Sequence, residues 1–186
     1  MPGRVKKVRK SGFTLIELVI VLVIMGLVMA IIVPTFYGRR ERSHIGAFVT
    51  QLNSLVQGAW RNALTTHQLQ RITFNFVDDK IVLMQAAGKN ATGDKDEFKP
   101  VRGLLTPTEV AVPEHYSFAN FYIEGRDEMA LGKRKDAYFF IMPDGTAQQV
   151  VINIKVQGED VEARRVGLVL NPFTAQFEWH DEFEKP

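Results

Sequence analysis

The sequence predicts an α+β protein in which one long N-terminal helix is followed by a mainly antiparallel β head. An uncharged run near the N-terminus leads into an apolar stripe with helical spacing, and beyond Leu69 the apolar spacing changes to two. Turn residues then separate several short strands. At 186 residues, the chain has room for one domain and an appendage.

Charge is distributed unevenly along the chain. Lys and Arg number 23 against 21 Asp and Glu, a formal net charge of +2. Residues 1–12 hold five basic side chains and no acidic one, so residues 13–186 carry 18 basic against 21 acidic, or −3. This balance does not mark nucleic acid as the default partner. The absence of cysteine excludes disulfides, thiolate metal sites and cysteine nucleophiles.

The first predicted element is an uncharged stretch of 21 residues, 18–38. Within 18–33 every residue except Gly26 is apolar, and twelve are Leu, Ile or Val. Each of these favours insertion at a helix centre by about 0.3–0.6 kcal/mol, on the order of 5 kcal/mol in all. Glu17 opposes insertion, but it lies at the edge of the run, where a charge costs less. The run is therefore predicted to be a membrane helix.

Two simpler interpretations of the run are a secretory signal and a plain membrane anchor. A secretory signal has an apolar core of about 7–15 residues before a small-residue cleavage site. This core is longer, and residues 33–36 lack such a site. The plain anchor stays open, because five basic residues before the run and three after it favour a cytoplasmic N-terminus.

A short motif precedes the run. The string Lys10-Ser11-Gly12-Phe13-Thr14-Leu15-Ile16-Glu17-Leu18 resembles the class III signal of type IV pilins and type II secretion pseudopilins. The resemblance implies cleavage after Gly12 by prepilin peptidase and N-methylation of Phe13. It makes Glu17 the family's assembly glutamate, and it places Pro34 where these proteins have a helix-kinking proline. The resemblance also implies that Glu17 pairs with the new amine of Phe13 on a neighbouring subunit. The physical reason is that a carboxylate in a low-dielectric filament core is strongly attracted to an ammonium group.

An amphipathic stretch follows the run. Its apolar residues recur at spacings of three and four: Ile45, Phe48, Val49, Leu52, Leu55, Val56, Ala59, Trp60, Ala63 and Leu64. We therefore expect one helix over about residues 14–65, with a membrane half and an amphipathic half. It is expected to bend near Pro34, because proline removes a backbone donor and clashes with the preceding turn.

The β head is predicted from alternation and turn residues. A hairpin is expected around Asp78-Asp79, and the last two strands are expected to pair around residues 171–174. Polar residues 86–100 predict a long exposed loop. The expected strands are 72–76, 80–84, 116–123, 137–142, 150–156, 166–170 and 176–179.

The C-terminal half narrows the resemblance within the family. Residues 139–147, with the alternating strand after them, are similar to the H-type minor pseudopilins and to related minor pilins, and so are residues 55–63. The sequence departs from that pattern at Trp60, and at 173–175, where Phe-Thr-Ala replaces the usual Thr-Gly.

No catalytic or metal-binding pattern is evident in the sequence. His44, His67, His115 and His180 lack metal-site spacing, and the acidic residues at 94–97 lack EF-hand spacing. Nucleophile-elbow and phosphate-loop motifs are also missing. We therefore expect no enzyme activity, no cofactor and no metal.

Two basic clusters are candidate sites for nucleic acid or a protein partner. They are Lys133, Arg134 and Lys135, and Arg164 and Arg165. The simpler interpretations are protection of a strand edge and a solvated face. The acidic tail, with Glu178, Asp181, Glu182 and Glu184, opposes DNA binding.

Together these features predict a leader at 1–12, a transmembrane and assembly helix at 13–36, an amphipathic helix at 37–65 and a periplasmic head at 66–186. The resemblance implies a minor pseudopilin of a type II secretion pseudopilus, single-pass in the bacterial inner membrane, with a cytoplasmic N-terminus. Its implied partners are prepilin peptidase, major and minor pseudopilins and the inner-membrane assembly platform, and beyond these the outer-membrane channel or exported proteins. The alternative is a minor type IV pilin that acts in pilus assembly or DNA uptake.

Overall fold

The computed structural model describes residues 14–89, 96–130, 134–157 and 163–186, and of residues 31–43, 89 and 96 it describes only the backbone. The chain divides into two compact units, Met1–Ser43 and His44–Pro186. The first contains the beginning of the long helix, and the second contains its remainder together with the strands.

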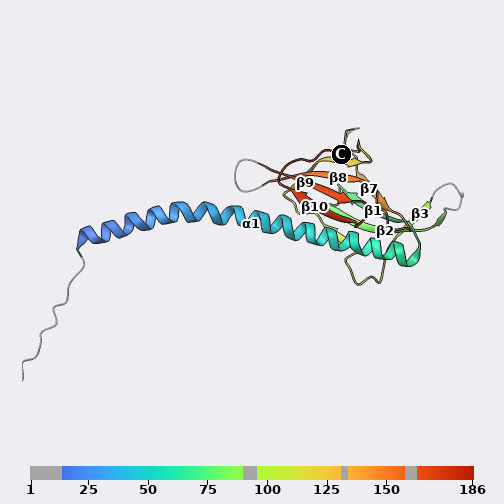
Figure 1. Ribbon diagram of the computed structural model, residues 1–186, viewed down its shortest axis with the longest axis horizontal. Coiled ribbons are helices and arrows are strands. Elements are labelled where there is room, and N and C mark those ends of the chain that lie inside the picture. Colours follow the sequence, from blue (N-terminus) through green and yellow to red (C-terminus); the bar gives the residue numbers. More distant parts are fainter. Residues whose placement is uncertain (1–13, 90–95, 131–133, 158–162) are drawn as a thin grey trace, which may run out of the picture. The chain divides into compact units, whose positions relative to one another are not determined.

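Helix α1 spans Leu15–Thr66 (Figure 1). The helix expected over about residues 14–65 is therefore confirmed to within one residue at each end. In the second unit the predicted stripe is buried except at its end, where Trp60 is partly buried and Leu64 is 36% exposed. The buried members are Ile45, Phe48, Val49, Leu52, Leu55, Val56, Ala59 and Ala63. The bend near Pro34 stays a prediction, since the Pro34 side chain is outside the described set.

The described residues form two antiparallel sheets. The first has the order β3-β2-β1-β7, with β4 paired to β2, and the second has the order β10-β9-β8-β5-β6. The first comprises β1 (Gln70–Asn75), β2 (Lys80–Lys89), β3 (Asp96–Pro100), β4 (Glu109–Ala111) and β7 (Asp136–Ile141). The second comprises β5 (Tyr116–Ile123), β6 (Arg126–Asp127), β8 (Val150–Val156), β9 (Arg164–Asn171) and β10 (Gln176–His180). The structure therefore confirms the predicted fold class, a long helix packed on a mainly antiparallel β head.

Both predicted hairpins are present. β1 and β2 pair across Asp78-Asp79, and β9 and β10 pair across residues 172–175. The predicted loop at 86–100 is wrong in part, because β2 continues to Lys89 and β3 begins at Asp96. The backbone pairing of Ala86 with Phe98 makes this segment a sheet edge, and polar side chains are compatible with a strand there. The short strands β4 and β6 were not predicted.

The core joins both sheets to the second part of α1. Phe74 of β1 lies at its centre, with its ring centroid 4.9 Å from that of Phe121 in the other sheet and 5.9 Å from that of Phe118. These edge-to-face contacts hold the sheets together through the inward faces of β1 and β5. Figure 1 shows the strands gathered beside the second part of α1.

Candidate functional site

Thr14 caps the N-terminus of α1. Its Oγ1 accepts a hydrogen bond from the Glu17 backbone N–H at 3.3 Å, and its carbonyl accepts one from the Leu18 N–H at 3.2 Å. Thr14 is therefore the N-cap and Glu17 the third helical residue, which is the Thr-x-x-Glu spacing of a capping box. An acid in the first turn also complements the helix dipole. Glu17 therefore helps to start the helix, whatever role it has in assembly.

The first part of α1 presents apolar side chains to every side. Every described side chain from Thr14 to Ala30 is exposed. Leu15 is 84% exposed, Val21 47% and Leu27 63%, although these three residues lie on different faces of the helix. A helix that is apolar all round is normally buried, so this segment needs apolar surroundings to cover it.

Among the residues that the structure describes, no helix has an apolar stretch long enough to span a membrane.

Several predicted site residues cannot be placed. Gly12, Phe13 and Lys133 lie outside the described residues, as does the Pro34 side chain. The predicted segment 13–36 includes Phe13 and the side chains of 31–36, so it stays a prediction. Among the described residues, no group of three or more His, Asp or Glu side chains is placed to hold a metal ion.

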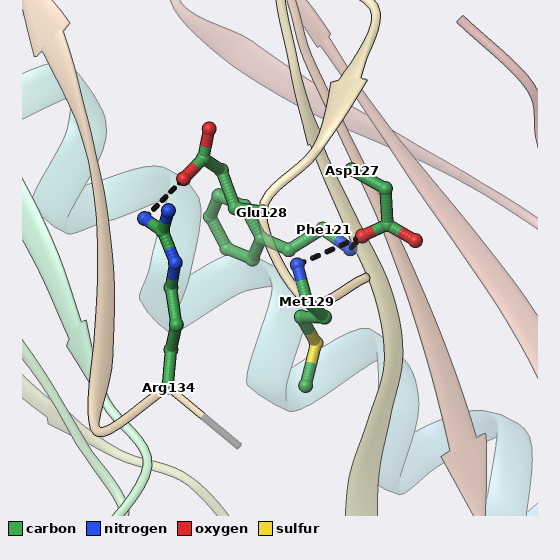
Figure 2. Close-up of polar contacts among 5 residues, drawn as sticks. All are labelled: Phe121, Asp127, Glu128, Met129 and Arg134. Atoms are coloured by element: carbon green, nitrogen blue, oxygen red, sulfur yellow. Dashed lines mark hydrogen bonds and ion pairs between the residues drawn. The ribbon is translucent and has the colours of Figure 1, made fainter. Parts of the chain in front are cut away.

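The arginines of the two basic clusters are engaged within the chain. Arg134, just before β7, forms an ion pair with Glu128 (Figure 2). Arg164, at the start of β9, forms one with Asp181. Arg165 lies 5.6 Å from the centroid of the Phe183 ring, while Lys135 is exposed. Arg164 and Arg165 lie in β9 of the second sheet, whereas Arg134 and Lys135 precede β7 of the first. The charges of Arg134 and Arg164 are already neutralised.

A pocket of about 180 Å³ opens beside Arg134. Asp127 orders the loop that forms one wall, since its Oδ1 accepts hydrogen bonds from the backbone N–H of Phe121 at 3.2 Å and of Met129 at 3.0 Å (Figure 2). The loop thereby places Glu128 opposite Arg134. The lining residues are Ile123, Glu128, Arg134, Ala137, Tyr138, Phe140 and Gln148. No sequence signal predicted this pocket, because it combines residues of three separate segments.

Residues 7–33 match the prokaryotic N-terminal methylation motif. The chain is 34% identical over 74 residues to the type II secretion system core protein G of Vibrio cholerae serotype O1. The resemblance to type IV pilins and type II secretion pseudopilins predicted from residues 10–18 is therefore confirmed.

These likenesses differ in extent. The match to core protein G covers 39% of this chain and 47% of that protein, so the chain spans about half the length of this curated relative. Among solved structures, the minor pseudopilin EpsH from the type 2 secretion system of Vibrio cholerae aligns with a TM-score of 0.48 and 10% identity. That alignment covers 72% of this chain and 93% of the other.

Proposed function

We propose that this chain is a minor pseudopilin of the H type, assembled into a type II secretion pseudopilus that supports protein export across the outer membrane. The observation that carries the proposal is the methylation motif at 7–33, joined to a helix whose described start is apolar on all sides. The likeness to a type II secretion core protein supports secretion as the process. The chain would act by assembly rather than by catalysis.

The proposed cycle begins in the inner membrane. Residues 13–36 anchor the precursor, with the basic N-terminus in the cytoplasm and the head in the periplasm. Prepilin peptidase cleaves after Gly12 and methylates Phe13, and the assembly platform then transfers the helix from lipid to the packed helices of other pseudopilins. Both surroundings cover the apolar side chains that α1 exposes between Leu15 and Met29.

Glu17 is the proposed register residue of assembly. In a helix bundle that excludes water, its carboxylate gains most when it meets the free amine of Phe13 on a neighbouring subunit. That pairing fixes one axial offset between subunits, because an unpaired charge is costly at every other offset.

Mass spectrometry of the mature protein tests the processing step. We expect an N-terminal methylated Phe13 when the chain is isolated from cells that contain prepilin peptidase, and an unprocessed Met1 chain from cells that lack it. An unprocessed chain within the assembled fraction of peptidase-containing cells would overturn the proposal.

A pair of substitutions separates the two roles of Glu17. Glu17→Gln keeps the capping-box side chain, since Gln also serves at this position, but it removes the charge, and Glu17→Val removes both. If pairing with the amine sets the register, we expect both variants to be lost from the pseudopilus, measured by co-isolation with the major subunit. The exposed Glu114→Gln is the matched control and should assemble normally. Normal assembly of Glu17→Gln would restrict Glu17 to helix capping.

The alternative, a minor type IV pilin in DNA uptake, shares the N-terminal chemistry and differs at the head. It requires the basic clusters to contact phosphates, although Arg134 and Arg164 already pair with carboxylates. DNA binding that weakens steeply with salt, and that is lost when Lys133, Arg134 and Lys135 are all replaced by Gln, would favour this alternative. We expect neither effect.

A further inference from the structure

Arg71 lies on the outward face of β1. Its neighbours Gln70 and Ile72 are fully buried toward the core, and strand alternation directs Arg71 to the opposite face. Its Cζ atom lies 4.2 Å from the centroid of the Phe98 ring and 5.3 Å from that of Tyr138. The guanidinium is therefore held on two aromatic rings supplied by β3 and β7, which flank β1 and β2 in the same sheet.

The Arg71 guanidinium has no carboxylate partner among the described residues. Its Nη2 contacts the Met84 sulfur at 2.9 Å, and sulfur is only a weak acceptor. Its Nε is buried and makes no hydrogen bond within the described part of the chain. By contrast, Arg134 and Arg164 each have a carboxylate. Since Nε is buried, the N–H donors left for an incoming carboxylate are those of the two Nη atoms at the outer end of the planar guanidinium.

We propose that Arg71, Met84, Phe98, Tyr138 and Phe140 form a docking surface for an extended, carboxylate-bearing segment of another protein. Charge complementarity carries the proposal, because a partly desolvated cation on this face has no counter-charge in the described chain. Arginine, methionine and aromatic side chains are also the types enriched in interface cores. The rings are already packed together, with centroids 5.8 Å apart for Phe98 and Phe140 and 5.5 Å apart for Tyr138 and Phe140.

The edge of β7 explains why the segment would be extended. β7 is the last strand of its sheet. The Phe140 N–H donates to Gln148 Oε1 at 2.9 Å, and the Phe140 carbonyl accepts from the Gln148 N–H at 3.1 Å, so the Phe140 backbone faces away from β1. Alternation along an antiparallel strand directs the Tyr138 backbone to the same side. Gln148 already occupies the Phe140 backbone, so an added strand could pair with β7 at Tyr138. This position lies beside the pocket of about 180 Å³ that Tyr138 and Phe140 line.

The surrounding charges favour a protein segment over a nucleic acid. Asp136 precedes Tyr138 by two residues and is exposed. Glu97, which precedes Phe98 and pairs with Lys99 at 3.7 Å, and Glu128, which pairs with Arg134 at the adjoining pocket, add two further acids. A polyphosphate laid across this face would meet these acids. A single carboxylate seated on Arg71 would not.

Peptide titration of the full-length chain in detergent micelles tests the proposal. The probe is a fluorescent, blocked Thr-Val-Glu-Val-Thr peptide, compared with the same peptide carrying Gln in place of Glu. We expect the Glu peptide to bind about tenfold more tightly, because hydrogen bonds to an ionised acceptor are roughly twice as strong as neutral ones. Arg71→Met should abolish this preference, whereas Arg61→Met, at an exposed position of α1, should preserve it.

Charge reversal gives a readout that mere damage to the fold would not produce. Arg71→Glu should prefer a Lys peptide over the Glu peptide, and circular dichroism should show its strands intact. Equal binding of the Glu and Gln peptides by the unmodified chain, or no binding of either, would overturn the proposal even if no variant folds. Arg71-dependent binding of a single-stranded oligonucleotide in place of the peptide would also overturn it. The assay requires neither cleavage nor assembly, so its failure leaves the proposed pseudopilin function untouched.

Discussion

Gly58 is the residue of α1 that lets a loop of the head pass close to the helix. A Cβ atom at this position would overlap both the Oγ1 and the Cβ of Thr106. We expect Gly58→Ala to lower the free energy of unfolding by about 1–3 kcal/mol, the usual cost of overpacking. Urea denaturation followed by circular dichroism measures this loss.

Gly46 provides a matched control in the same helix. No atom lies within 4 Å of a Cβ added there. Gly46→Ala should therefore be neutral or raise stability by up to about 1 kcal/mol, through helix propensity alone. Equal effects of the two substitutions would show that the contact with Thr106 does not limit position 58.

Tyr116 has a buried hydroxyl without a hydrogen-bond partner among the described residues. Burial raises the pKa of Tyr116 above its usual 10.0. Because the unfolded chain then loses the tyrosine proton first, the folded state loses stability as pH rises above about 10. Tyr116→Phe should be neutral or stabilising by up to about 1 kcal/mol at pH 7, since it removes an unsatisfied polar group and keeps the ring against Phe48.

The measurement for Tyr116 is the difference in thermal stability between the two proteins as a function of pH. The advantage of Tyr116→Phe should widen above pH 10. A less stable Tyr116→Phe protein at pH 7 would show that the hydroxyl has a partner in solution.

At the scale of elements, the sequence predicts those helices and strands whose positions follow from the local spacing of apolar residues. The buried stripe of α1 repeats with the helical period over more than five turns, so its length and face follow directly. Strand β3 has no such signal, because it exists only through its pairing with β2 at a sheet edge. The same reasoning separates the sites. The motif around Gly12 and Glu17 is contiguous, whereas the partners of Arg71 come from β3 and β7 and depend on strand register.

The outer edge of the last strand, β10, is hydrogen-bonded to helix α1. The Asn53 Nδ2 donates to the Phe177 carbonyl at 2.9 Å, and the Asn53 Oδ1 accepts from the Phe177 N–H at 2.7 Å. Asn53→Ala should lower the free energy of unfolding by about 1–3 kcal/mol, because both backbone groups lose their partner. Hydrogen exchange at the Phe177 amide should accelerate in parallel.

Two comparisons sharpen this prediction. Gln51→Ala, at an exposed position of the same helix, should leave both stability and exchange nearly unchanged. Asn53→Asp keeps an acceptor for the Phe177 N–H but aims a carboxylate at the Phe177 carbonyl, so it should also destabilise. If Asn53→Ala unfolds like the unmodified chain, the helix does not stabilise the edge of β10.

At the scale of the whole molecule, the two compact units have opposite solubility requirements. The head has a buried core that includes its own part of α1. It carries 15 basic and 19 acidic side chains over residues 44–186, a net charge of −4 that favours solubility. The described start of α1, in the other unit, exposes large apolar side chains from Leu15 to Met29. Association of the full chain should therefore depend on the N-terminal unit.

A chain that begins at His44 tests this division. Because every buried residue of the α1 stripe lies at or beyond Ile45, we expect the shortened protein to unfold cooperatively and to be monomeric without detergent. The full-length chain should require detergent or lipid, since contiguous exposed apolar surface promotes association. Sedimentation velocity with and without detergent makes the comparison, and thermal unfolding checks the fold. If the shortened protein self-associates as strongly as the full chain, the association surface lies on the head instead.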